Sequence, residues 1–399
     1  MNARTLLLGA LFATAFPFFC QAQTIDAKHL NFSASGRFVH VLDGWDLYQN
    51  VIGTTNYDMY DIKAGVSTRR EDGGWFERAY NYPGFGLGLS YQRMGSLHFK
   101  GDTRLGDMLN LYGWTEFDIV RTRHFRLGPV LELGIAFCQR IYHPATSPDN
   151  LFLGAPVFAL VGGGLNAEWL FTGQWSLIAG AYLTHHSNGM LSVPNYGFNE
   201  LSFSAGVRYR MAPADPVNRR GPKPELPEYA KGLHWNFYAA GGAHASSREM
   251  DAALGADLPP EQWFPIPIRA RVIAGVEGVW RYSPIFASGL GIDVNYAENR
   301  YRETDLLLVG ATDPKGYSPV YAGIYLIQEF WYRRVSVHLN AGLHFFKKTG
   351  LTENMGLDYQ RIGIRYHFKK PKGLFAGLSL RIHNFDRSYC QEWCLGYSL

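Results

Sequence analysis

Residues 175–187 read WSLIAGAYLTHHS, and every second residue of the run is apolar over most of its length. Side chains two residues apart lie on the same face of a β-strand. One face of this predicted strand is therefore apolar and consists of Trp175, Leu177, Ala179, Ala181 and Leu183. The same face ends in His185 and Ser187, which puts an imidazole and a hydroxyl at the end of a surface that otherwise suits lipid.

Other parts of the chain alternate in the same way. Residues 286–296, 335–345 and 361–368 each set an apolar face against a polar one, which is the pattern of outer-membrane strands. An aromatic content of 15%, 44 glycines and 18% charged residues fit this class better than they fit a soluble enzyme. After the leader, no run of about 18 apolar residues is present, which excludes a helical membrane protein. The net charge of +4, without a long basic run, gives no reason to expect nucleic acid as a partner.

The chain divides into four expected segments. Residues 1–22 contain Arg4, an apolar stretch and a small-residue cleavage signal, which predicts a secretory signal peptide. Residues 23–211 hold about eight strands, and residues 233–399 hold about eight more. Residues 212–232, rich in Pro, Arg and Lys, separate them and read as a periplasmic linker.

The strand count allows two β-barrel architectures. We favour two tandem eight-stranded barrels, because each half has enough strands to close its own edges. The alternative is one 16-stranded barrel in which residues 212–232 form a long periplasmic turn.

Short turns such as residues 121–124 and 172–174 alternate with longer loops. In outer-membrane barrels the short turns are periplasmic. The strand at 175–187 then runs outward, and its end lies at the depth of lipopolysaccharide. In the next expected strand, residues 199–211, alternation predicts Asn199 on the lipid face and Glu200 in the lumen. Pairing of the two strands would bring Asn199 towards His185 and Ser187. The three residues would then have the geometry of an orienting group, a base and a nucleophile, respectively.

The string His185-His186-Ser187-Asn188-Gly189, followed by Pro194-Asn195-Tyr196-Gly197-Phe198-Asn199, resembles a motif of the lipid A 3-O-deacylase family. These acyloxyacyl hydrolase-like proteins are outer-membrane serine esterases with an eight-stranded barrel. Further similarity comes from Trp75, Tyr80, Pro83, Gly86 and Gly88, and from Asp149-Asn150 with Gly154. The resemblance covers residues 30–211. The second half resembles only extended, longer relatives.

The resemblance implies that Ser187 is the nucleophile and His185 the general base, with Asn188 and the backbone near Gly189 as oxyanion donors. The sequence departs from the family at the third member, where Asn199 replaces a Glu and Glu200 follows. An Asn can hold the imidazole in the right tautomer but stabilises the imidazolium less than a carboxylate does. We favour Asn199 over Glu200, since turning Glu200 outward needs a bulge that would reset the alternation.

The expected function is therefore removal of an ester-linked acyl chain, at the 3 position, from lipid A, with no metal or cofactor. The alternatives are a non-enzymatic barrel, either a narrow porin or a structural protein, and an esterase for another lipid, such as a phospholipid. The second half is expected to be a degenerate, silent barrel, because His383 points inward and Phe385 stands where a nucleophile would. Candidate loop cations for lipopolysaccharide phosphates are Arg37, Lys100, Arg104 and Lys347–Lys348, although scattered loop charges are more often only solvated.

Overall fold

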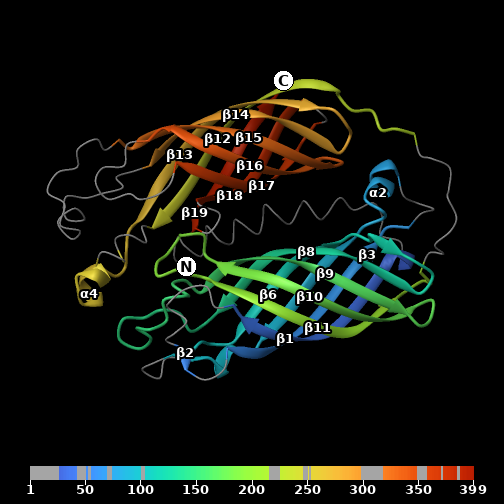
Figure 1. Cartoon of the computed structure of the whole chain (residues 1–399), viewed down its shortest axis with the longest axis horizontal. Helices are drawn as coiled ribbons and strands as arrows, with labels where there is room; N and C mark the ends of the chain where they lie inside the picture. Colours follow the sequence, from blue (N-terminus) through green and yellow to red (C-terminus); the bar gives the residue numbers. More distant parts are fainter. Residues whose placement is uncertain are drawn as a thin grey trace. The chain divides into compact units, whose positions relative to one another are not determined.

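The computed structural model describes most of the chain, as two β-barrels (Figure 1). The described residues are 27–42, 51–52, 55–69, 74–99, 104–214, 225–245, 250, 253–297, 318–347, 357–369, 372–383 and 387–399. The expected signal peptide, residues 1–22, lies outside them, as do residues 215–224 of the expected linker. The main division between the two compact units falls between Leu226 and Pro227.

Eight antiparallel strands form the first barrel, in the order β6-β4-β3-β1-β11-β10-β9-β8, and pairing of β6 with β8 closes it. The strands are β1 (Leu30–Val41), β3 (Asn56–Ser67), β4 (Gly84–Gln92), β6 (Met108–Glu116), β8 (Phe125–Cys138), β9 (Val157–Leu170), β10 (Trp175–Ser187) and β11 (Phe198–Arg210). The smaller elements are η2 (Ala27–His29), β2 (Val51–Ile52), α2 (Trp75–Ala79), η4 (Met94–Ser96), β5 (His98–Phe99) and β7 (Val120–Arg121).

The second barrel has eight antiparallel strands in sequence order, with β12 paired to β19. They are β12 (Gly232–Ala245), β13 (Ile268–Arg281), β14 (Phe286–Ala297), β15 (Val320–Tyr332), β16 (Val335–Phe346), β17 (Asp358–His367), β18 (Gly373–His383) and β19 (Arg387–Ser398), with α4 (Pro260–Trp263) between β12 and β13. Because each half closes on itself, the prediction of two tandem barrels is confirmed and the 16-stranded alternative is wrong. Among the described residues, no helix is long and apolar enough to cross a membrane.

Alternation along the strands separates an apolar outside from a polar inside. On β10, Leu177 and Leu183 are exposed, whereas Ser176 and Thr184 are buried in the lumen. Closed ladders leave no backbone edge unpaired, which lets such strands cross a membrane without a helix.

Ion pairs fill both lumens. In the first barrel, Arg37 lies between Asp61 and Glu132, at 2.8 Å from each. In the second, Asp293 contacts Arg361 at 2.7 Å and Arg381 at 2.9 Å. The expectation that Arg37 contacts lipopolysaccharide from a loop is wrong, because alternation on β1 turns this side chain inward, where it is 4% exposed.

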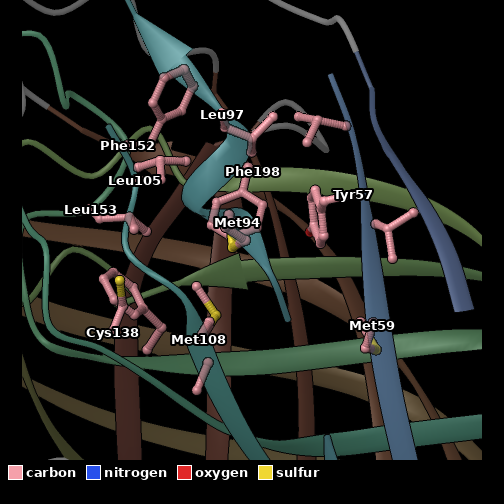
Figure 2. Close-up of a cluster of buried hydrophobic side chains, with 14 residues drawn as sticks. Tyr57, Met59, Met94, Leu97, Leu105, Met108, Cys138, Phe152, Leu153 and Phe198 are labelled. Carbon is pink, nitrogen blue, oxygen red and sulfur yellow. The ribbon is translucent and has the colours of Figure 1, made fainter. Parts of the chain in front are cut away.

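An apolar cluster closes one end of the first barrel (Figure 2). Phe198 at the start of β11 packs there with Tyr57 and Met59 of β3 and with Met94 of η4. The cluster is completed by Val39, Val41, Leu97, Leu105, Met108, Ala136, Cys138, Phe152, Leu153 and Phe158. It fixes the end of the barrel at which β10 stops and β11 begins.

The opposite end of the first barrel holds the short turns, with one exception. The connection between β3 and β4, residues 68–83, lies at this end because the strands alternate in direction, and it contains α2. Arg121 donates hydrogen bonds to the carbonyl oxygens of Asn81 and Tyr82, at 3.4 and 3.3 Å. The short-turn rule therefore fails for this connection, which is long and folded.

The lipid-facing surface predicts a depth-dependent effect of charge. Phe203, midway along β11, is 55% exposed, and Trp175 begins β10. We expect Phe203→Arg to lower the free energy of unfolding by about 2–4 kcal/mol, and Trp175→Arg by about 0–1 kcal/mol, because a charge costs most at the bilayer centre. Urea unfolding of the full chain in lipid bilayers measures both values. Equal losses would contradict the assigned membrane depth.

Candidate functional site

The register between β10 and β11 sets the candidate site. His185 lies directly opposite Asn199, and pairing continues without a bulge from Trp175 to His186. Both side chains lie on the outside of the barrel, where His185 is half-buried and Asn199 exposed. His185 Nδ1 is 2.8 Å from Asn199 Oδ1. The alternation thus brings together two of the residues proposed from the sequence.

Ser187 is the last residue of β10 and is 6% exposed. Asn195 binds it from the segment that leads to β11: its Nδ2 donates to Ser187 Oγ at 2.9 Å. Asn195 Oδ1 accepts a hydrogen bond from the backbone N–H of Asn188, also at 2.9 Å. One amide side chain therefore joins the candidate nucleophile to the residue proposed as an oxyanion donor.

Gly197, in the same segment, lies beside both His185 and Ser187. Its φ is +62°, a left-handed conformation that favours glycine. A Cβ atom at this position would lie 3.4 Å from both His185 Cε1 and Ser187 Cβ, and 2.5 Å from the carbonyl oxygen of His186. His185 and Ser187 therefore flank one small space.

The connection between β8 and β9 supports this segment. The backbone N–H groups of Tyr196 and Gly197 donate to the carbonyl oxygens of Leu151 and Phe152, each at 3.2 Å. Asn150 orders the connection, because its Oδ1 accepts from Leu153 N at 3.3 Å and its Nδ2 donates to Arg140 O at 3.3 Å. The Asp149-Asn150 part of the motif thus supports the site indirectly, through the backbone hydrogen bonds between this connection and residues 196–197.

Glu200 lies in the lumen, away from His185. Its carboxylate accepts hydrogen bonds from Tyr57 and, at 3.2 Å, from Gln92 Nε2. Its nearest imidazole is the lumen residue His186, at 3.8 Å, which also stacks on Phe198. No bulge turns Glu200 outward, so Asn199 is the residue available to orient His185.

The geometry allows base chemistry at His185. Asn199 Oδ1 only accepts hydrogen bonds, so His185 Nδ1 carries the proton in this contact. The neutral ring then has its unprotonated nitrogen at Nε2, which is the arrangement of a general base.

A second imidazole–amide pair lies on the same outer surface. His40 on β1 is opposite Asn56 on β3, and His40 Nδ1 is 2.8 Å from Asn56 Oδ1. Leu42 occupies the position two residues on, where the first pair has Ser187. Thr55 Oγ1 is 3.3 Å from the same Nδ1 and so does not adjoin Nε2. An outward His–Asn pair is therefore not specific for catalysis without the serine.

In the second barrel, His383 points inward, as expected: it is 1% exposed, and its Nδ1 is 2.9 Å from Asp358 O. Phe385 lies outside the described residues. Across the described part of the chain, no group of three or more His, Cys, Asp or Glu side chains is arranged to hold a metal ion.

Asn195 lies within the motif, but its role was not predicted from the sequence. Its double contact depends on how residues 188–197 fold back on β10. Strand alternation carries no information about such a turn. The signal available was the Pro194-Asn195 pair before a glycine, which indicates a specific turn.

Comparison with protein families assigns residues 233–399 to the model described as acyloxyacyl hydrolase, C-terminal domain. The match confirms the resemblance to this family, but it lies in the second half of the chain, whereas the motif lies within residues 30–211. Among curated proteins, none matches the chain in sequence.

Several solved outer-membrane barrels are similar to this chain. Neisserial surface protein A is 15% identical, with 45% of this chain and 96% of that chain covered and a TM-score of 0.30. The outer membrane enzyme PagL is 16% identical, with 44% and 98% covered and a TM-score of 0.28. The N-terminal barrel of Pseudomonas aeruginosa OprF is 12% identical, with 45% and 97% covered and a TM-score of 0.24. Closed barrels with an apolar outside belong to the Gram-negative outer membrane, and this chain is located there.

Because the space around Gly197 is tight, any side chain at this position is expected to lower the stability of the first barrel. We expect Gly197→Ala to destabilise the first barrel by about 1–2 kcal/mol from the left-handed backbone alone, and further through the contact with His186 O. Gly36→Ala is the matched control, because a Cβ atom there meets nothing within 4 Å. Urea unfolding compares the two variants. Equal stability would mean that Gly197 is not constrained.

Proposed function

We propose that this chain, whose residues 233–399 match the acyloxyacyl hydrolase C-terminal domain, is a serine esterase that removes an ester-linked acyl chain from the 3 position of lipid A. The observation that carries the proposal is the outward His185–Asn199 pair, 2.8 Å apart, beside Ser187 at the end of an apolar lipid-facing strand. A hydrophobic ester in the outer leaflet could meet a base and a hydroxyl there without leaving the membrane.

The proposed reaction has two steps. His185 Nε2 takes the proton from Ser187 Oγ as Ser187 attacks the ester carbonyl; the tetrahedral intermediate then expels the lipid A hydroxyl, which receives that proton. In the second step, water loses a proton to His185 and attacks the acyl-serine. The fatty acid leaves and the proton returns to Ser187. Asn199 holds the imidazole in the required tautomer throughout.

Negative charge on the intermediate requires hydrogen-bond donors. Asn188 and the backbone near Gly189 are the donors proposed from the motif. Asn195 holds Asn188 N and Ser187 Oγ through the two ends of one amide, at 2.9 Å each. This link would keep the nucleophile and the donors at a constant separation.

The outer surface below His185 suits an acyl chain. Val161 on β9 lies opposite His185, and Leu183 precedes it on the same face of β10; these side chains are 42% and 58% exposed. An acyl chain lying along these residues would bury apolar surface and bring its ester to the end of the strand.

The porin alternative has less support. Besides the Arg37 pairs, Arg208 in the first lumen contacts Glu116 at 2.9 Å and Glu168 at 3.1 Å. Arg365 in the second contacts Glu277 at 2.6 Å. Side chains paired across a small lumen leave little room for a water-filled channel.

The two barrels differ in the residues that could carry the reaction. The first holds His185, Asn199 and Ser187 at one strand end, whereas His383 in the second points into the lumen. We assign hydrolysis to the first barrel and a non-catalytic role to the degenerate second barrel.

Loss of the base or of the nucleophile tests the proposal. We expect Ser187→Ala and His185→Ala each to lower deacylation by at least about 10³-fold, because the remaining groups cannot replace the attack. His40→Ala is the matched control, since His40 has the same type of partner at the same distance but no serine beside it. Mass spectrometry of lipid A and phospholipids from cells expressing each variant measures the outcome. An unchanged loss of the acyl chain with Ser187→Ala would refute the esterase, and loss from phospholipid instead would change the substrate.

Replacing the amide at position 199 by a carboxylate is expected to raise activity. We expect Asn199→Asp to raise kcat about tenfold, because a carboxylate stabilises the imidazolium by about 1–2 kcal/mol more than an amide does. Asn56→Asp, in the second His–Asn pair, should leave kcat unchanged. Rates on purified lipopolysaccharide in detergent compare the variants. A lower rate for Asn199→Asp would show that Asn199 does not orient the catalytic base.

A further inference from the structure

A basic pocket opens at the short-turn end of the first barrel. The space between its lining residues, open solvent included, is about 320 Å³, and only a small part of it is wide enough to hold a water molecule. Arg121, Arg126 and Arg210 line it together with Lys28, His29 and Arg69, and among the residues that the structure describes no Asp or Glu lines it. Ser187 lies at the opposite end of the strands, so this pocket is separate from the candidate esterase site.

The carboxylates near the pocket do not pair equally well with the guanidinium groups of Arg121, Arg126 and Arg210. Asp118 is 2.6 Å from Arg121 but 3.9 Å from Arg126. Glu168 contacts Arg210 at 2.5 Å and is shared with Arg208. Among the described residues, Asp118 and Glu168 are the carboxylates in contact with the three pocket arginines. Arg208, which also contacts Glu168, has Glu116 as a further partner at 2.9 Å.

Arg126 has the poorest partners of these arginines. It is 7% exposed, and its Nε has no hydrogen-bond partner, a feature that it shares with Arg37, Arg208 and Arg210. Its closest ionic contact among the described residues is the 3.9 Å approach to Asp118, and Glu168 lies opposite it across the β8–β9 ladder without a direct hydrogen bond. A buried guanidinium without hydrogen bonds is costly. Arg37, by contrast, has two carboxylates at 2.8 Å.

We propose that this pocket binds the phosphate group of an anionic ligand, with Arg126 as its main contact. Guanidinium groups bind phosphate through paired, charge-assisted hydrogen bonds, which would satisfy the donors that Arg126 leaves unused. Arg121 and Arg210 line the same pocket and add positive charge. The hydroxyl groups of Ser67 and Thr68 also line it and suit a phosphate oxygen.

Two sources could supply the phosphate. One is a free phosphate or phosphorylated solute in the periplasm. The other is the head group of an anionic phospholipid in the inner leaflet, which lies at this end of the barrel if the short turns are periplasmic. Both present the same chemistry to Arg126.

Calorimetric titration of the full-length chain in detergent with inorganic phosphate tests the pocket directly. We expect Arg126→Met to weaken binding by at least about tenfold. Arg123→Gln is the matched control, because Arg123 is exposed in the adjacent turn and does not line the pocket. Ser187→Ala should bind phosphate as the wild type does, so failure of the esterase and failure of this pocket remain distinguishable.

Stability gives a second, independent measure. Without phosphate, Arg126→Met should raise the unfolding temperature, because it removes a buried charge with poor partners. Adding phosphate at constant ionic strength should stabilise the wild type and leave Arg126→Met unchanged. A destabilised Arg126→Met in phosphate-free buffer would overturn the proposal, since Arg126 would then have structural partners.

Vesicles distinguish the two sources. Greater stability in vesicles with phosphatidylglycerol than in zwitterionic vesicles, lost in Arg126→Met, would assign the pocket to a lipid head group. Stabilisation by inorganic phosphate with no such lipid effect would assign it to a soluble ligand. Binding of neither probe, or equal binding by wild type and Arg126→Met, would overturn the proposal.

Discussion

The unbroken pairing of β10 with β11 is the constraint on which the candidate site depends. A strand has a side-chain period of two, so a slip of one residue would exchange the lipid face and the lumen face of β11. Asn199 would then turn inward and Glu200 outward. The ladder prevents this because Ser202, Ser204 and Arg208 have their places in the lumen while Phe203 and Val207 face lipid. The position of one amide beside His185 is thus enforced by the whole length of the strand.

Strand alternation predicted the wall of the barrels well. The bounds of β10 agree with the run at residues 175–187, and β11 begins at Phe198, one residue before the expected start. The number of barrels also followed from the strand count of each half. The strand bounds depend on period-two patterns, which are local properties of the sequence, and the number of barrels depends on the general rule that exposed sheet edges are closed.

Contacts between distant segments were not predictable in this way. Asn195 reaches Ser187 only because residues 188–197 fold back, and the His40–Asn56 pair forms across two strands joined by a long connection. Arg37 was misplaced for a different reason, since a charged residue near the start of a barrel reads equally well as loop or lumen. The family match to residues 233–399 also lies outside the half that carries the motif.

An amide rather than a carboxylate at position 199 would affect the reactivity of His185 more than it affects the free energy of placing this side chain in the membrane. Acidic side chains on the lipid face cost little near the interface, about 0–1 kcal/mol, and Asn199 lies at the end of its strand. A carboxylate would stabilise imidazolium by more than that. Asn199 Oδ1 accepts a hydrogen bond from His185 Nδ1–H without adding charge. In the proposed reaction the ring would therefore keep its tautomer but gain less stabilisation in the charged transition state than a carboxylate would give.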